Sequence, residues 1–123
     1  MPTVTFIEIR TKIIIENFET EVLAVVDTRA SNIVIQQELI PEKYYEKAYN
    51  VRTARQMDGN TYTYDTTIHN SILQFEINNN HCTSPYIVEE IYVRNFPYQM
   101  ILGLAFVLQA YHGMILTRIG LHF

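Results

Sequence analysis

The fold of this chain is decided by the stretch Val22-Leu23-Ala24-Val25-Val26-Asp27-Thr28-Arg29-Ala30-Ser31. Its first five residues form an uninterrupted apolar run, which is typical of a strand buried on both faces. The run ends abruptly in an acid, Asp27, and a hydroxyl residue, Thr28. No other acid in the sequence follows a buried strand so directly. Taken alone, Asp27 could also be a turn residue that binds its own backbone.

The bulk composition predicts one packed domain. The chain has 123 residues, of which 48% are hydrophobic and 18% are charged. These values favour a folded core over disorder, and we expect a single domain over residues 1–123. The net charge of -4, without a basic run, predicts that neither nucleic acid nor a membrane surface is the partner. The longest apolar run, residues 100–108, is far shorter than the roughly 20 residues of a membrane span.

Cysteine and histidine usage predicts no cofactor. The single cysteine, Cys82, excludes an internal disulfide and fits a reducing compartment. The four histidines show no metal-ligand spacing, so we expect neither a metal nor another cofactor. The first ten residues alternate in hydrophobicity and do not form the apolar segment of a signal peptide.

The dominant hydrophobic period is two, which predicts a mostly β protein. Strands are expected at residues 3–10, continuing into 12–15, and at residues 22–26, 32–35, 61–64, 71–77, 86–93 and 114–119. Short helices are expected at residues 38–49 and at residues 103–109. Asp58-Gly59 is a strong hairpin dipeptide and predicts the tip of a two-stranded arm. Met57, Tyr62 and Tyr64 are candidates to line a pocket there, although tyrosine is also ordinary strand composition.

Three motifs together resemble a known family. Two apolar residues followed by Asp27-Thr28, a third residue, then Ala30 and Ser31 resemble the catalytic loop of retropepsin-type aspartic proteases. The second signature of that family, two aliphatic residues and a glycine, is matched by Ile101-Leu102-Gly103. Its flap, a hairpin with a glycine near the tip, is matched by Asp58-Gly59. The long spacing from Asp27 to Gly103 and the tyrosine-rich flap are most similar to the protease domain of plant pararetroviruses of the badnavirus and tungro bacilliform type.

The resemblance implies a retropepsin-like closed β-barrel with one or two short helices. It also implies an aspartic endopeptidase that processes a viral polyprotein, released from that polyprotein into the host cell cytoplasm or the virion. Such an enzyme needs two carboxylates that share one proton. The chain supplies only Asp27, so the implied active form is a homodimer with one Asp27 and one Thr28 from each subunit. Met57, Asp58 and Gly59 would close over the peptide substrate.

Arg29 departs from the family, which carries glycine at this position. An arginine here would crowd the cleft and favour ionisation of both carboxylates. One hypothesis is therefore a catalytically impaired or inactive retropepsin-like domain that serves in dimerisation or binding. The alternatives are a chance or engineered substitution, or an arginine turned away to pair with Glu21 or Asp65. A third interpretation is an unrelated small β-barrel binding protein in which Asp27 only makes a turn.

The remaining titratable residues carry no motif. We expect the histidines at the surface or the edge of the core. The acids Asp65, Glu76, Glu89 and Glu90 do not pair into a second catalytic carboxylate, and we expect them on solvated strand faces.

Overall fold

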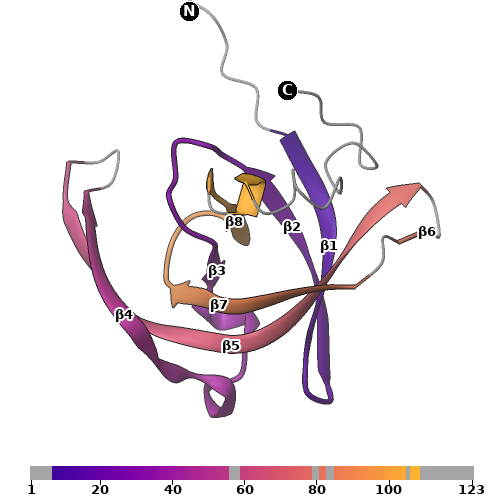
Figure 1. Cartoon of the computed structure of the whole chain (residues 1–123), viewed down its shortest axis with the longest axis horizontal. Coiled ribbons are helices and arrows are strands. Elements are labelled where there is room, and N and C mark those ends of the chain that lie inside the picture. The colour runs from indigo at the N-terminus through magenta and orange to yellow at the C-terminus, as the bar shows by residue number, and fades with distance from the viewer. Residues whose placement is uncertain (1–6, 56–58, 79–80, 83–84, 105, 109–123) are drawn as a thin grey trace, which may run out of the picture.

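The computed structural model describes residues 7–55, 59–78, 81–82, 85–104 and 106–108 (Figure 1). Most of this part of the chain is β-strand, as expected. The strands are β1 (Ile7–Ile15), β2 (Phe18–Val26), β3 (Val34–Gln36), β4 (Glu46–Arg55), β5 (Thr61–Asn78), β6 (His81–Cys82), β7 (Tyr86–Arg94) and β8 (Met100–Leu102). Two single 3-10 turns, η1 (Gln37–Leu39) and η2 (Glu42–Tyr44), lie between β3 and β4. Leu104 and residues 106–108 are α-helical.

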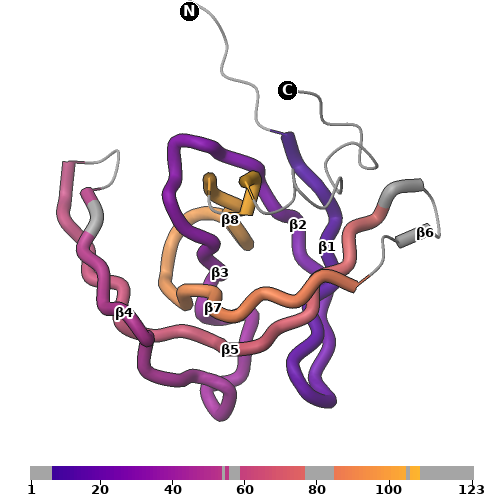
Figure 2. Tube along the Cα trace, viewed as in Figure 1, coloured from indigo at the N-terminus to yellow at the C-terminus, as the bar shows by residue number. Residues whose placement is uncertain are grey.

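Six strands close into a barrel. They pair in the order β1-β2-β8-β3-β7-β5, and β5 returns to β1 through the register Thr11↔Phe75 to Ile14↔Ile72. Closure depends on the length of β5, which at 18 residues reaches β4, β7, β1 and β6 in turn. Figure 2 shows the trace returning on itself around the core. The prediction of a mostly β, retropepsin-like closed barrel is therefore confirmed.

The core fills the barrel and continues under the C-terminal helical turn. Along β1 the side chains alternate, so that Ile9, Thr11, Ile13 and Ile15 are buried. Phe75 and Phe106 are fully buried, with their ring centroids 5.3 Å apart. Phe106 also meets Tyr86 edge-on. These aromatic contacts bind the helical turn after Gly103 to the strands.

The helix expected at residues 38–49 is wrong. The side chain of Gln36 accepts a hydrogen bond from Glu38 N–H and starts η1, and Pro41 then precedes η2. From Glu46 the chain continues as β4, which pairs with β5. The Glu and Lys residues that suggested a helix lie on exposed positions of these turns and of that strand. Tertiary pairing here overrides helix propensity.

Several predicted strand boundaries also change. The expected strands at 61–64 and 71–77 are one strand, β5, and the expected strand at 32–35 is observed at Val34–Gln36. β2 is not buried on both faces, because the side chain of Leu23 is 40% exposed. The expected strand at 114–119 lies outside the described residues, as do residues 3–6. Within the described part of the chain, no helix has the length and apolarity that crossing a membrane requires.

Candidate active site

Asp27 lies where β2 leaves the barrel. β2 runs parallel to β8, with Val26 opposite Leu102. The N–H of Asp27 donates to the carbonyl of Leu102 at 3.1 Å, so this pairing continues for one residue beyond the strand. The chain then turns, and Ala30 N–H donates back to the carbonyl of Asp27 at 3.1 Å. The acid is therefore held by backbone bonds on both sides.

Gly103 lets the loop after Asp27 and the second motif pass each other. Leu104 N–H donates to the carbonyl of Ala30 at 2.7 Å. A Cβ on Gly103 would lie 2.3 Å from the carbonyl oxygen of Asn32 and 2.6 Å from that of Ala30. Only glycine allows so close an approach of two backbones. Ile101 and Leu102 precede it in β8, with Leu102 fully buried, so the structure brings both sequence motifs together.

Arg29 caps the carboxylate of Asp27. Its Nε donates to Oδ1 at 3.1 Å and its Nη2 donates to Oδ2 at 3.3 Å, while the backbone N–H of Arg29 also donates to Oδ1 at 3.0 Å. The sequence left open a pairing of Arg29 with Glu21 or Asp65. The structure instead places the guanidinium on the candidate catalytic acid itself.

This contact sets the charge of the site. Burial raises the pKa of Asp27, but the hydrogen bonds from the side chain and backbone of Arg29, with its positive charge, outweigh burial and lower that pKa below its ordinary value. Asp27 in turn raises the pKa of Arg29 through the hydrogen bond and its negative charge. In the single chain, Asp27 is therefore a carboxylate whose two oxygens already carry donors.

The neighbouring loop residues differ in their exposure. Thr28 is exposed in the single chain, whereas Ala30 is partly buried beside Gly103.

The arm predicted around Asp58-Gly59 is formed by β4 and β5, which pair from Arg52↔Tyr64 to Arg55↔Thr61. Figure 1 shows it extending away from the barrel. Gly59 is exposed and has a φ of 83°, a conformation that favours glycine. Met57 and Asp58 lie outside the described residues.

Tyr62 and Tyr64 pack on the barrel at the base of the arm. Tyr64 is buried and meets Tyr92 edge-on, with ring centroids 5.5 Å apart. The guanidinium carbon of Arg94 lies 3.4 Å from the ring centroid of Tyr62 and 5.3 Å from that of Tyr64. These rings therefore fix the arm to β7.

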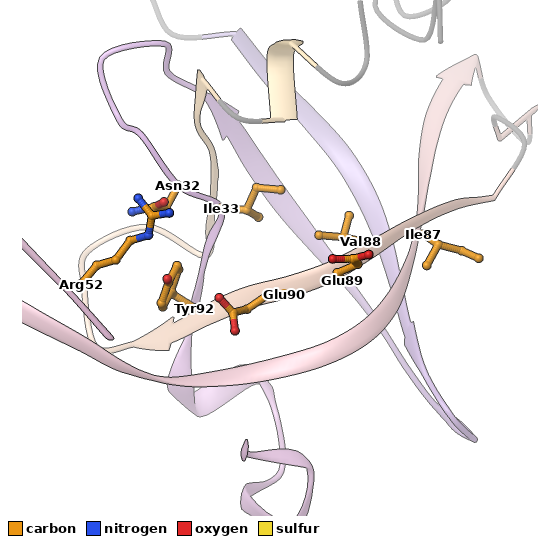
Figure 3. Close-up of a pocket in the computed structure, with 8 residues that line it drawn as sticks. All are labelled: Asn32, Ile33, Arg52, Ile87, Val88, Glu89, Glu90 and Tyr92. Atoms are coloured by element: carbon orange, nitrogen blue, oxygen red, sulfur yellow. The ribbon is translucent and has the colours of Figure 1, made fainter. Parts of the chain in front are cut away.

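A pocket of about 510 Å³ lies between residues 32–33, β4 and β7 (Figure 3). It is lined by Asn32, Ile33, Arg52, Ile87, Val88, Glu89, Glu90 and Tyr92. Asn32 and Ile33 follow the loop that begins at Asp27, Arg52 belongs to β4, and the other residues belong to β7. Sequence reasoning missed this pocket because its walls come from three separate segments, and no local motif marks them.

The prediction from sequence is wrong for one acid, Glu90. Glu90 does not lie on a solvated strand face, since its side chain is only 16% exposed. Its Oε2 accepts a hydrogen bond from Tyr49 N–H at 2.8 Å. Among the described residues, no group of three or more His, Cys, Asp and Glu side chains is arranged to hold a metal ion.

The comparison with protein families agrees with this geometry. The family model described as Peptidase A3B matches residues 23–115. The chain belongs to the peptidase A3B family. This is a retropepsin-like family of the caulimovirus and badnavirus type, and the matched segment contains Asp27, the arm and Gly103. No curated protein gives a significant match to the chain. As a peptidase A3B domain, the chain carries the fold of an aspartic peptidase, and the badnavirus type itself stays a prediction.

Proposed function

We propose that this chain is an aspartic endopeptidase that cleaves a viral polyprotein as a homodimer, and that Arg29 restrains Asp27 until the dimer or the substrate forms. The observation that carries the proposal is the position of Asp27. In a chain of the peptidase A3B family, this acid stands at the end of a barrel strand, where its N–H donates to the carbonyl of Leu102. Two such acids, one from each subunit, would supply the base that activates water and the acid that protonates the carbonyl oxygen.

Exposed apolar residues near the loop support the homodimer. Ile7 pairs with Val26, the residue before Asp27, and is 46% exposed. Leu104 follows Gly103 and is 41% exposed, and Leu108 lies one helical turn further and is 57% exposed. A second copy docked through the catalytic loops would bury such side chains and bring the two acids together. The peptide or polyprotein substrate would then lie extended under both flaps.

The contact of Arg29 with Asp27 favours the alternative of a catalytically impaired enzyme. General base catalysis needs a carboxylate oxygen that accepts a hydrogen bond from water, and the pair of acids needs one shared proton. The guanidinium of Arg29 binds both oxygens, so neither is free to accept a hydrogen bond from water. It also lowers the pKa of Asp27, which disfavours the shared proton. Catalysis by this sequence therefore requires Arg29 to leave Asp27 when the dimer or substrate forms.

Cleavage of a polyprotein-derived peptide between about pH 4 and pH 7 tests the proposal. We expect slow cleavage by the parent chain and a rate at least roughly tenfold higher for Arg29→Gly, because removal of a charged hydrogen-bonding group frees both oxygens. Asp27→Asn in the Arg29→Gly background is the control and should be inactive. Cleavage that survives Asp27→Asn would contradict the protease mechanism. An Arg29→Gly chain that is no faster than the parent would contradict the restraint by Arg29.

A further inference from the structure

The pocket between residues 32–33, β4 and β7 follows an edge of β7 (Figure 3). Four consecutive residues of that strand, 87–90, line it. Successive side chains of a strand point to opposite faces, so a pocket that touches four in a row runs along the edge of the strand. β7 pairs with β3 only from Tyr92 onward. The pocket therefore opens at a stretch of strand edge that precedes this pairing.

The lining combines aliphatic walls with carboxylates. Ile33 and Val88 are buried, whereas Ile87 is exposed. Glu89 and Glu90 follow directly along the same strand. A lysine or arginine side chain has matching parts, because its apolar stem packs on aliphatic surface while its charged head stays at the polar end.

The carboxylate of Glu90 already binds the arm. The register of β4 with β5 shifts between Lys47 and Arg52, which leaves a bulge in β4. In this bulge, Tyr49 N–H donates to Oε2 of Glu90 at 2.8 Å, and the same oxygen lies 3.5 Å from Nε2 of His69. Glu90 therefore holds β4 against β7 and adds negative charge to the pocket.

Arg52 is likewise bound, whereas Glu89 is open. Burial raises the pKa of Tyr92, and a side-chain hydrogen bond with Arg52 opposes that rise, so the guanidinium has a partner within the lining. Among the described residues, Glu89 has neither a hydrogen bond nor an ion pair, and it is exposed. Figure 3 shows Arg52 well separated from Glu89. A cation beside Glu89 would thus meet an open carboxylate away from the guanidinium.

The pocket borders the path of a bound peptide. In the proposed function, an extended peptide passes between the loop after Asp27 and the arm of β4 and β5. Asn32 and Ile33 continue that loop, and Arg52 belongs to β4. A side chain of the peptide can therefore enter the pocket while the peptide backbone stays between the loop and the arm.

We propose that this pocket selects a lysine or arginine side chain of the peptide substrate, and that Glu89 determines this preference. The inference rests on the proposed function, because it names a substrate feature of the same enzyme. The stem of the basic side chain packs on Ile33 and Ile87, and its charged head faces Glu89. The lining carries one cation and two anions, so it is negative overall and disfavours an acidic side chain.

Cleavage of a peptide library tests the preference. The Arg29→Gly chain digests a mixture of peptides with varied sequences at about pH 6, and mass spectrometry identifies the residues around each cut. We expect lysine and arginine to be enriched about threefold at one position, the size of one partly exposed ion pair. When Glu89→Lys is added, that position should select aspartate and glutamate instead, because the lining becomes positive.

Glu16→Lys in the Arg29→Gly background is the matched control. It changes the net charge equally, but Glu16 lies in the exposed turn between β1 and β2 and does not line the pocket. The basic preference should persist in this variant. A preference that Glu16→Lys removes as Glu89→Lys does would show an effect of net charge alone and would overturn the inference.

A binding measurement separates this inference from the proposed function. N-acetyl-lysine N-methylamide is titrated into the parent chain, and N-acetyl-norleucine N-methylamide, which keeps the stem but lacks the ammonium, is the matched probe. We expect the lysine probe to shift the NMR signals of the Glu89 carboxyl and the Ile87 methyl groups, with the Glu16 carboxyl as the reference. The norleucine probe should leave the Glu89 signal unchanged.

The two measurements assign every outcome. Cleavage without a basic preference, or with a basic preference that survives Glu89→Lys, would overturn the inference and leave the protease intact. If no variant cleaves the library, the proposed function fails and the titration decides. Shifts at Glu89 that are specific to the lysine probe would then support the pocket, and equal or absent shifts would overturn it.

Discussion

The guanidinium of Arg29 holds both carboxylate oxygens of Asp27, at 3.1 Å from Oδ1 and 3.3 Å from Oδ2. The two residues are separated by one position in a tight turn, and the backbone N–H of Arg29 donates to the same carboxylate. The contact therefore needs only the local conformation of the loop. The side chain of Arg29 is 50% exposed, so the pair changes the chemistry of Asp27 more than it stabilises the fold.

The pKa of Asp27 should rise when this contact is removed. Its folded-state pKa is below the ordinary value, so the pair stabilises the fold above the pKa of unfolded Asp, about 3.9, and this stability is lost as the pH falls toward the folded pKa. In Arg29→Gly we expect a higher pKa of Asp27 and a weaker loss of stability in acid. A carboxyl carbon NMR titration of Asp27 measures the first effect and urea unfolding between about pH 2 and pH 6 measures the second. Arg29→Lys, which keeps the charge without the two-pronged contact, should give an intermediate pKa. An unchanged pKa in Arg29→Gly would contradict the assignment of the cause.

Gly103→Ala should destabilise the fold severely. The new Cβ would lie 2.3 Å from the carbonyl oxygen of Asn32, a backbone atom that cannot move without opening the loop after Asp27. We expect a loss of roughly 3 kcal/mol or more in the free energy of unfolding, measured by urea denaturation. Gly59→Ala is the matched control. Apart from its two chain neighbours, no atom of the described residues lies within 4 Å of its added Cβ, and only its φ of 83° is strained, so about 1 kcal/mol is expected. Equal losses in the two variants would show that the crossing at Gly103 is not a tight contact.

Leu104→Arg should weaken self-association of the chain. Leu104 is exposed beside the catalytic loop, where the proposed partner subunit would cover it. Burying an arginine in that interface would raise the dimer dissociation constant at least roughly tenfold. Sedimentation equilibrium measures the constant directly. Ile87→Arg changes an equally apolar but 66% exposed residue on β7 and should leave it unchanged. If both substitutions weaken association alike, the interface does not lie at the catalytic loop.

Arg94→Lys should loosen the base of the arm formed by β4 and β5. The planar guanidinium of Arg94 stacks on Tyr62 at 3.4 Å from the ring centroid, and a lysine ammonium cannot reproduce this stacking. We expect a loss of about 1 kcal/mol in unfolding free energy, together with faster amide exchange along β4. Arg10→Lys on the exposed side of β1 is the control and should be neutral. A neutral Arg94→Lys would mean that the stacked pair does not stabilise the arm.

The sequence alone predicted much of the barrel and the position of the candidate catalytic acid. The period of two along β1 and the end of β2 at Asp27 follow from strand sterics and turn chemistry, which act between neighbouring residues. Gly103 was predicted as part of a supporting motif, and the structure shows why glycine is needed there, because an added Cβ would collide with the backbone of Asn32. The helix predicted at residues 38–49 failed because pairing of β4 with β5 outweighed local propensity.

The contact of Arg29 with Asp27 is local, and the sequence alone did not choose between it and an arginine turned away toward Glu21 or Asp65. The contacts between strands were decided by tertiary structure. His69 and Glu90 carried no motif, because the register between β5 and β7 and the bulge in β4 bring them together. Periodicity and turn signals act over a few residues, so one sequence can determine them by itself. The partner of a charged side chain depends on which strands lie side by side and in what register, and only the closed barrel determines that.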